Sequence, residues 1–382
     1  MLPVWLRQVD RALRELSQRV TLLGAATPSN AREERARLRE FAGRGSHAMP
    51  SWRYAPHVGH VERRVAPRWP GVRRRLDALL VELRALHDFS LAMLYETRVR
   101  ELLLEARICE CVGTKDASPL AARRFGPFGP TTAAAADLLA DAWINEHPLA
   151  PLLGEAERDP REVDTVIATD DPHPHSLLSL LRAEVGRRRI PFAVVVHPHL
   201  SALAATGNQT ILVAAGRRIT GEATRRTVLH EIEGHVLPRV RAARAPLGIL
   251  SIGTARSADE QEGYALLLEE RHGFSTPVRR RELAGRYLAV RAMRQGANFV
   301  EVVRRLTGDY GVPTRDAVVM AERAFRGSDG TFPGLGRERV YLESYVRVRA
   351  LLADAPDDEA VLASGQVSLD AIDALRPYVA SG

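Results

Sequence analysis

The chain has 382 residues, of which 45% are hydrophobic, 5% aromatic and 26% charged, and its formal net charge is +7. This composition excludes a disordered or collagen-like chain, and two cysteines are too few for a disulfide scaffold. A length of this order provides one large domain or two ordinary domains with a sizeable core.

The positive charge is carried almost entirely by arginine, since Lys115 is the only lysine. The arginines are spread along the whole chain and alternate with acids, as at residues 73–75 before Asp77. A nucleic-acid binder is expected to concentrate them in one stripe, with aromatic side chains to stack on bases. The distribution therefore argues against a nucleic-acid partner.

Residues 1–23 have the pattern of an amphipathic helix, because apolar residues recur at steps of three and four: Leu2, Trp5, Val9, Leu13, Leu16 and Val20. A secretory signal has an uninterrupted apolar stretch instead. No segment approaches the roughly 18 to 20 uncharged apolar residues of a membrane span. We therefore expect a cytoplasmic protein with no membrane partner.

Helices are also predicted over about 70–86, 89–111 and 132–144, each from apolar periodicity and the breakers that flank it. The segment 159–175 is rich in Asp, Pro and His and is typical of a turn-rich connector. We therefore predict an N-terminal helical region over residues 1–160 and a second region over residues 161–382, with the two packed as one unit.

The second region begins differently. Two short apolar runs, at 191–197 and 209–215, predict neighbouring antiparallel strands. Thr220 is then expected to cap a helix that ends at Pro238. Further helices are expected at about 257–272, 277–294, 298–310, 314–325 and 337–352. The predicted fold is a predominantly helical α+β protein with a small antiparallel sheet beside the helix at 220–237.

That helix contains His230, Glu231 and His235. Two imidazoles with an adjacent carboxylate suit zinc-dependent hydrolysis, in which the carboxylate takes a proton from water. In the common motif the histidines are four residues apart, whereas here the separation is five, which is about 140° around a regular helix. A π-type turn brings such residues back to one side, and Gly234 supplies backbone freedom for it. An irregular helix is therefore predicted.

A third ligand is available about 30 residues further on, where Asp259, Glu260 and Glu262 open a predicted helix. Two histidines and one glutamate leave the fourth position of a zinc ion open, which is typical of a catalytic site. Acids in a first helical turn also complement the helix dipole, and this alternative accounts for Asp259 or Glu260.

Other metal-ligating pairs occur at Cys109–Cys111, His173–His175 and His197–His199. The two cysteines point to different faces of a helix, so reduced thiols are expected. Each histidine pair encloses a proline and has no nearby carboxylate in the motif, which favours a turn. None of these pairs replaces the site at 230–262 as the predicted metal centre.

The segment 230–235, followed by Gln261-Glu262-Gly263-Tyr264-Ala265, resembles a bacterial family named for its Gln-Glu-Gly-Leu-Ala motif and its eukaryotic relatives, the microtubule-associated tyrosine carboxypeptidases. Further segments between about 48 and 350 are similar to this family in the expected order: 49–54, 112–114, 124–127, 295–299, 323–327 and 336–342. The chain departs from the family at Tyr264, which replaces leucine, and at residues 337–338, where Arg-Glu replaces Lys-Asp.

The resemblance implies a zincin-like zinc peptidase core over residues 161–382, with Zn²⁺ as cofactor. Carried over residue by residue, His230, His235 and Glu262 bind the metal and Glu231 is the catalytic base. The expected reaction is removal of C-terminal residues from a peptide or protein tail. The alternative is a catalytically inactive binding or regulatory protein on the same fold.

The remaining site residues are inferred from what such a reaction needs. The tetrahedral intermediate needs a hydrogen-bond donor, for which Tyr341 is preferred to Tyr264. A free substrate carboxylate suits a bidentate arginine, for which Arg326 is placed first, followed by Arg323 and Arg337. The strand at 209–215 is expected to present an edge to an extended peptide.

Overall fold

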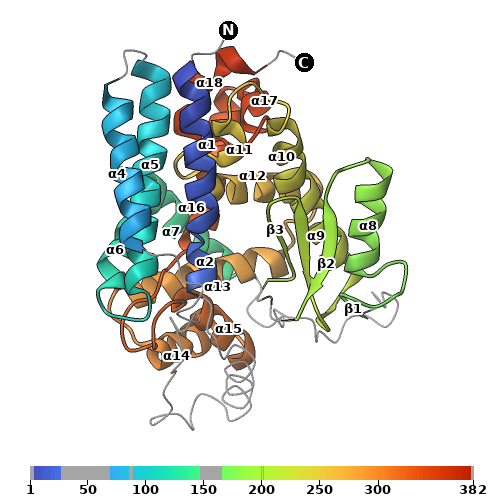
Figure 1. Ribbon diagram of the computed structural model, residues 1–382. Helices are drawn as coiled ribbons and strands as arrows, with labels where there is room; N and C mark the ends of the chain where they lie inside the picture. The colour runs from blue at the N-terminus through green and yellow to red at the C-terminus, as the bar shows by residue number, and fades with distance from the viewer. Residues whose placement is uncertain are drawn as a thin grey trace.

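The computed structural model describes residues 4–26, 69–85, 89–146, 166–198, 200 and 202–379. Figure 1 shows a body of helices beside a smaller part that contains the strands. The predicted division at residue 160 lies outside the described residues, as does the family-like segment 49–54. The division stays a prediction, although one apolar cluster contains buried side chains from Leu6 to Leu375.

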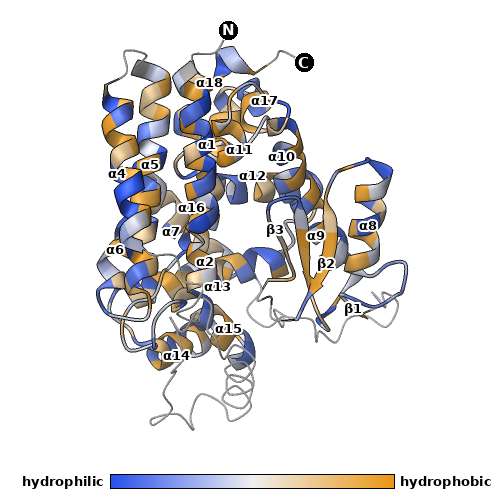
Figure 2. Ribbon diagram, viewed as in Figure 1, coloured by the Kyte–Doolittle hydropathy of each residue, from blue (hydrophilic) through white to orange (hydrophobic). Residues whose placement is uncertain are grey.

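The helices of the N-terminal half are α1 (Val4–Arg19), the short α2 (Leu22–Ala25), α4 (Trp69–Arg84), α5 (Phe89–Cys111), α6 (Ala117–Arg124) and α7 (Pro130–Ile144). Helices α1, α4 and α5 stand roughly side by side in Figure 1. Around α4, hydrophilic and hydrophobic residues alternate (Figure 2), as expected for a helix with one buried stripe. The predicted apolar face of the first helix is confirmed, since Leu13 and Leu16 are fully buried.

The sheet region follows, with β1 (Ile167–Ala168), α8 (Leu177–Arg187), β2 (Ala193–His197), β3 (Ala204–Thr206), β4 (Thr210–Ala214) and β5 (Arg218–Ile219). A three-stranded sheet has the order β2-β4-β3, and β1 pairs with β5 antiparallel in a second, smaller sheet. Side chains from α8, the sheet and the helix at 230–236 share a second apolar cluster, which includes Leu181, Ile211 and Ile232.

The predicted antiparallel pairing of the two apolar runs is wrong. Strand β2 runs parallel to β4, with Ala193 opposite Thr210. The reason is β3, a three-residue strand that forms an antiparallel hairpin with β4, so the chain has already reversed once before β4 begins. Strand β4 is therefore central and has no free edge, which also overturns the expected peptide-binding edge at 209–215. The edges of this sheet are β2 and β3.

Three consecutive segments form the long helical path after the sheet: α9 (Gly221–Leu229), the π-helix η2 (His230–Val236) and α10 (Leu237–Ala242). The predicted cap is confirmed, since the Thr220 side chain accepts a hydrogen bond from the Ala223 amide. Pro238 does not end the helix, contrary to prediction. It lies in the first turn of α10, where the change of winding makes its missing N–H tolerable.

The C-terminal half is helical: α11 (Ile249–Ile252), α12 (Ser257–Arg271), α13 (Pro277–Arg294), α14 (Phe299–Tyr310), α15 (Thr314–Ala324), α16 (Arg339–Asp354), α17 (Asp358–Leu362) and α18 (Ile372–Leu375), with short 3-10 turns at Leu369–Ala371 and Arg376–Tyr378. The predicted helices from 257 onward agree with α12 to α16 within a few residues. Gly263 of α12 lies against the backbone of Ser344, so α12 and α16 approach closely. None of the described helices is long and apolar enough to span a membrane.

Candidate metal centre and its cavity

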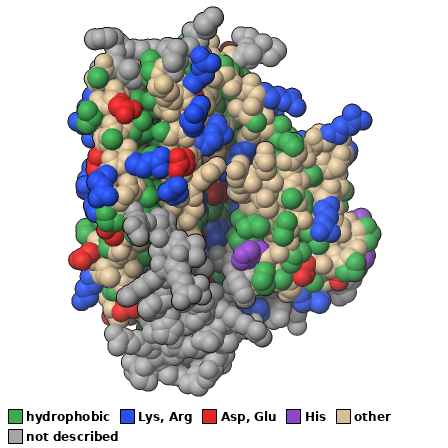
Figure 3. Space-filling model, viewed as in Figure 1, with side chains coloured by type: hydrophobic (Ala, Val, Ile, Leu, Met, Phe, Trp, Pro, Cys, Tyr) green, Lys and Arg blue, Asp and Glu red, His purple; other side chains and the backbone are tan. Residues whose placement is uncertain are grey.

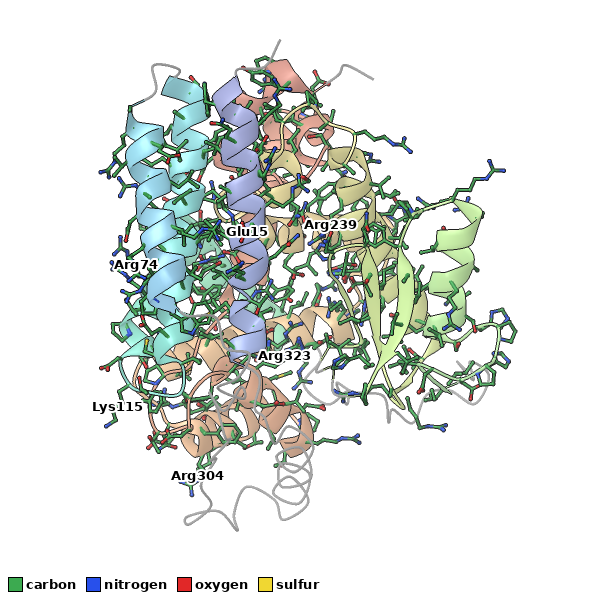
Figure 4. All side chains as sticks on the ribbon, viewed as in Figure 1. Glu15, Arg74, Lys115, Arg239, Arg304 and Arg323 are labelled. Atoms are coloured by element: carbon green, nitrogen blue, oxygen red, sulfur yellow. The ribbon has the colours of Figure 1, made fainter. Side chains whose placement is uncertain are left out.

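A cavity of about 770 Å³ lies between the helical body and the sheet region. Figure 3 shows a hollow there, with acidic and basic side chains inside it. One wall, the sheet wall, is formed by β3 and its neighbours: Leu200, Ala202, Leu203, Ala204, Ala205, Thr206 and Leu212. The opposite side, the helical wall, is formed by charged residues of α12, α13, α15 and the segment just before α16, together with Tyr341 of α16. Figure 4 shows Arg239 and Arg323 above and below the space in this view.

The π-helix η2 lies between the two walls and carries His230, Glu231 and His235. The predicted irregular helix is confirmed, and its wide turn brings the two histidine rings to 5.0 Å between centroids. Gly234 serves a different purpose from the one predicted. Its φ is not positive, but a Cβ there would lie 2.5 Å from Cβ of Ala265, so glycine is needed for the close approach of η2 and α12.

The three predicted metal ligands converge. The Nε2 atoms of His230 and His235 are 3.2 Å apart, and Oε2 of Glu262 is 3.4 Å from the first and 3.7 Å from the second. Donors on a tetrahedral zinc ion, with bonds of about 2.0–2.1 Å, are about 3.3–3.4 Å from one another. The donor types and their separations therefore fit a zinc ion. The longest separation, between His235 and Glu262, would need to shorten by only a few tenths of an ångström.

The second nitrogen of His230 is held by Glu269, which is 2% exposed, through a contact of 2.7 Å between Nδ1 and Oε1. Arg279 donates to both carboxylate oxygens of Glu269, at 2.9 and 3.1 Å. Burial alone would raise the pKa of Glu269, but Arg279 and His230 lower it to about 2. An ionised Glu269 accepts a hydrogen bond from Nδ1–H of His230, so Nε2 is left free for a metal.

The second oxygen of Glu262 is held in a similar way. Arg337 donates to Oε1 of Glu262 at 2.9 Å and to the Tyr341 hydroxyl at 3.3 Å. Although burial opposes ionisation, hydrogen bonds from the two histidines and the Arg337 charge hold the pKa of Glu262 well below its usual range. Only Oε2 therefore faces the histidines. Tyr341 lines the cavity, and burial raises the pKa of its hydroxyl.

Glu231 lies beside the three ligands and also lines the cavity. The residue is 6% exposed, and its Oε2 accepts a hydrogen bond of 2.7 Å from the Thr206 hydroxyl on β3. The sheet edge thus orients the side chain that was predicted to be the base.

The predicted substrate-binding residues separate into two groups. Arg323, Arg326 and Arg337 line the cavity, with Arg323 3.3 Å from Oε1 of Glu338, whereas Arg337 is engaged by Glu262. Tyr264 does not lie among the cavity residues. It is two positions from Glu262, about 200° around α12, and its hydroxyl donates to Glu359 at 3.1 Å. A substrate-facing role for Tyr264 therefore has no support from its position.

Sequence reasoning missed Glu269, Arg279 and Thr206. A signal for Glu269 was present, because residues seven apart on a helix share a face and Glu269 follows Glu262 by seven. Arg279 and Thr206 come from other elements and had no local signal.

The rival pairs do not form metal groups among the described residues, where the one cluster of at least three ligating side chains is His230, His235 and Glu262. His173 Nδ1 accepts a hydrogen bond from the His175 amide, as in a turn. Cys109 is buried, and Cys111 donates to a backbone carbonyl of its own helix. His199 lies outside the described residues.

Comparison with known proteins gives one family. The family model described as microtubule-associated tyrosine carboxypeptidase matches residues 40–382. No curated protein matches the chain. Among solved structures, a protein of unknown function from Shewanella oneidensis is 13% identical, with 81% of this chain and 71% of that chain covered and a TM-score of 0.41.

Proposed function

This chain belongs to the microtubule-associated tyrosine carboxypeptidase family, and from that premise we propose that it is a zinc-dependent carboxypeptidase acting on the C-terminal end of a peptide or protein. The single observation that carries the proposal is the convergence of His230, His235 and Glu262 beside Glu231 in a cavity. An open position on the metal, which a catalytic site requires, is consistent with a set of three protein ligands.

His230, His235 and Glu262 would hold the metal, with Glu269 and Arg337 orienting two of them. When bound there, Zn²⁺ supplies Lewis acidity toward a carbonyl oxygen and toward water. Glu231 accepts a proton at its carboxylate and returns it to the leaving amine, while the Thr206 hydroxyl keeps that carboxylate in place. The Tyr341 hydroxyl, on the cavity wall, donates a hydrogen bond to the developing oxyanion.

The substrate chain is proposed to lie along β3 rather than β4. Ala205 faces its β4 partner Leu212, between two hydrogen-bonded pairs of the hairpin, so the backbone groups of Ala204 and Thr206 point to the free edge. An extended peptide adds to such an edge by backbone hydrogen bonds. Arg326 and Arg323, on the helical wall, would attract the carboxyl end.

The test combines metal analysis with peptide digestion. Wild-type protein is expected to contain about one zinc per chain and to shorten peptides from the C-terminal end, as seen by mass spectrometry of a peptide library. Glu231→Gln should keep the zinc and lower kcat about 10²- to 10⁴-fold, the usual contribution of a general base. The library should include peptides that end in tyrosine, the residue in the family name.

Two results would overturn the proposal. Turnover that survives Glu231→Gln unchanged would exclude this residue as the base. A zinc-loaded wild-type protein that binds library peptides and shortens none would instead identify the inactive binding protein.

A further inference from the structure

A chain of alternating carboxylates and guanidinium groups runs along the helical wall from the metal centre to α15. Its consecutive contacts are Glu269–Arg279 at 2.9 Å, Arg279–Glu282 at 2.9 Å, Glu282–Arg286 at 3.5 Å, Arg286–Glu338 at 2.6 Å and Glu338–Arg323 at 3.3 Å. The three glutamates and three arginines of this chain balance one another in charge. Each of these arginines has a carboxylate as its partner.

Arg226 lies beside this chain but outside its charge balance. It is on α9, one helical turn before His230, and lines the cavity with 14% of its side chain exposed. The nearest carboxylate oxygen is Oε2 of Glu269, at 3.9 Å from its Nε, and that carboxylate is bonded more closely to Arg279 and His230. Among the residues that the structure describes, none accepts a hydrogen bond from the Arg226 guanidinium.

The surroundings of Arg226 leave its charge only partly compensated. Burial and the neighbouring Arg279 lower its pKa, against weaker opposing effects of Glu269, Glu282 and Glu222. Buried charges are normally paired and hydrogen-bonded, because removal of a charge from water is costly. A cation that lacks hydrogen bonds and faces a cavity is therefore suited to an anion that enters the cavity.

We propose that Arg226 binds a carboxylate of the substrate and makes the enzyme selective for chains that carry one beside the scissile bond. This inference rests on the proposed peptidase function. Arg226 precedes His230 by four residues, a separation of about 6 Å along a helix, and an extended peptide advances about 3.3–3.6 Å per residue. A carboxylate one or two residues beyond the scissile bond thus lies within reach of the guanidinium fork, which matches a carboxylate in geometry.

Two sources can supply this carboxylate. One is the C-terminal carboxyl group itself, in which case Arg226 takes the role proposed above for Arg326 and Arg323; the other is the side chain of an Asp or Glu near the end. Matched peptides distinguish them. One pair differs only in a free-acid or amidated terminus, and the other differs only in Glu or Gln near the end. The variants are Arg226→Gln and Arg226→Lys, which retains charge but loses the fork.

The control is Arg225→Gln, which removes the same charge from an exposed neighbouring position on the same helix. Binding is measured by calorimetry on the zinc-loaded Glu231→Gln background, and KM and kcat are measured on the active protein. Zinc content and thermal unfolding are recorded for every variant, so that a folding or metal defect is recognised separately.

The wild type is expected to prefer one carboxylate-bearing peptide over its neutral partner by 10-fold or more. Arg226→Gln should abolish that preference through Kd and KM, with kcat changed less; Arg226→Lys should restore part of it, and Arg225→Gln should retain all of it. A full preference in Arg226→Gln with normal zinc content overturns the inference. If the wild type cleaves no peptide while Arg226-dependent carboxylate binding persists, the peptidase proposal fails and the inference stands.

Discussion

The two walls of the cavity are built on different principles. The sheet wall is mainly apolar and is attached to η2 by packing, with Ile211, Ile232 and Val236 buried in one cluster. The helical wall is made of ion pairs, in which Glu282 and Glu338 each contact two arginines. The sheet wall offers shape and a backbone edge, whereas the helical wall offers charge and holds the metal ligands in place.

This difference shows how one cavity can separate recognition from catalysis. A buried ion-pair chain has directional contacts and tolerates little displacement, so it suits the orientation of ligands. An apolar wall with a free strand edge accepts varied side chains. Four substitutions test the contrast, in descending order of expected effect.

Removal of one charge from the helical wall should cause the largest loss of stability. Glu282→Gln breaks a buried chain and is expected to lower the free energy of unfolding by about 3–5 kcal/mol at pH 7. Arg279 and Arg286 lower the pKa of Glu282 to about 2 despite its burial. The stabilisation is therefore present above about pH 4.5 and is lost as the pH falls toward 2. The difference from wild type should shrink over that range.

Urea denaturation at several pH values, with a chelator present, measures this difference. Glu82→Gln, at an exposed position on α4, is the control and should change little. An equal loss for Glu282→Gln at pH 3 and pH 7 would contradict a charge-based role.

The junction between η2 and α12 is the next most sensitive feature. Gly234→Ala places a Cβ 2.5 Å from Cβ of Ala265 and is expected to lower the free energy of unfolding by about 1–3 kcal/mol. Zinc affinity should fall as well, since η2 and α12 carry the ligands. Gly186→Ala is the control: nothing lies within 4 Å of its Cβ, so a neutral or slightly stabilising effect is expected.

Glu269→Gln tests whether Glu269 orients the His230 ring, because glutamine keeps the side-chain volume but removes the charge. Because its carboxylate holds Nδ1 of His230, zinc affinity is expected to fall 10- to 100-fold, as measured by competition with a chelator. Glu270→Gln, the adjacent and more exposed residue, should leave zinc affinity unchanged. Equal zinc affinity in both variants would assign Glu269 to charge balance alone.

The smallest effect is expected on the sheet wall, where Thr206 donates a hydrogen bond to Glu231. Thr206→Val removes that bond and should lower kcat/KM by about 2- to 13-fold, which corresponds to 0.5–1.5 kcal/mol, with zinc content unchanged. Thr210→Val, on the adjacent strand, should have no such effect. A loss of zinc in Thr206→Val would show that the two walls are not independent.

Much of the candidate site was accessible from sequence because its signals are local. The five-residue spacing of His230 and His235 required a wide turn, and Thr220 capped the helix as predicted. The predictions that failed concerned contacts between residues distant in the sequence. The strand at Ala204–Thr206 is too short to be recognised by pattern, so the predicted direction of β2 relative to β4 was wrong. Nothing local indicated that Arg337 is bound to Glu262.

The segment that contains α1 and α2 precedes the matched family range, which begins at residue 40, yet Leu23, Gly24 and Ala26 line the cavity. Asp10 of α1 also accepts a hydrogen bond from the Gly248 amide, so the segment is fastened to the helices behind the cavity. Truncation at the family boundary would thus remove part of the wall around a bound peptide. Expression of residues 40–382 alone is expected to yield a protein with altered peptide selectivity and an exposed apolar surface that promotes aggregation.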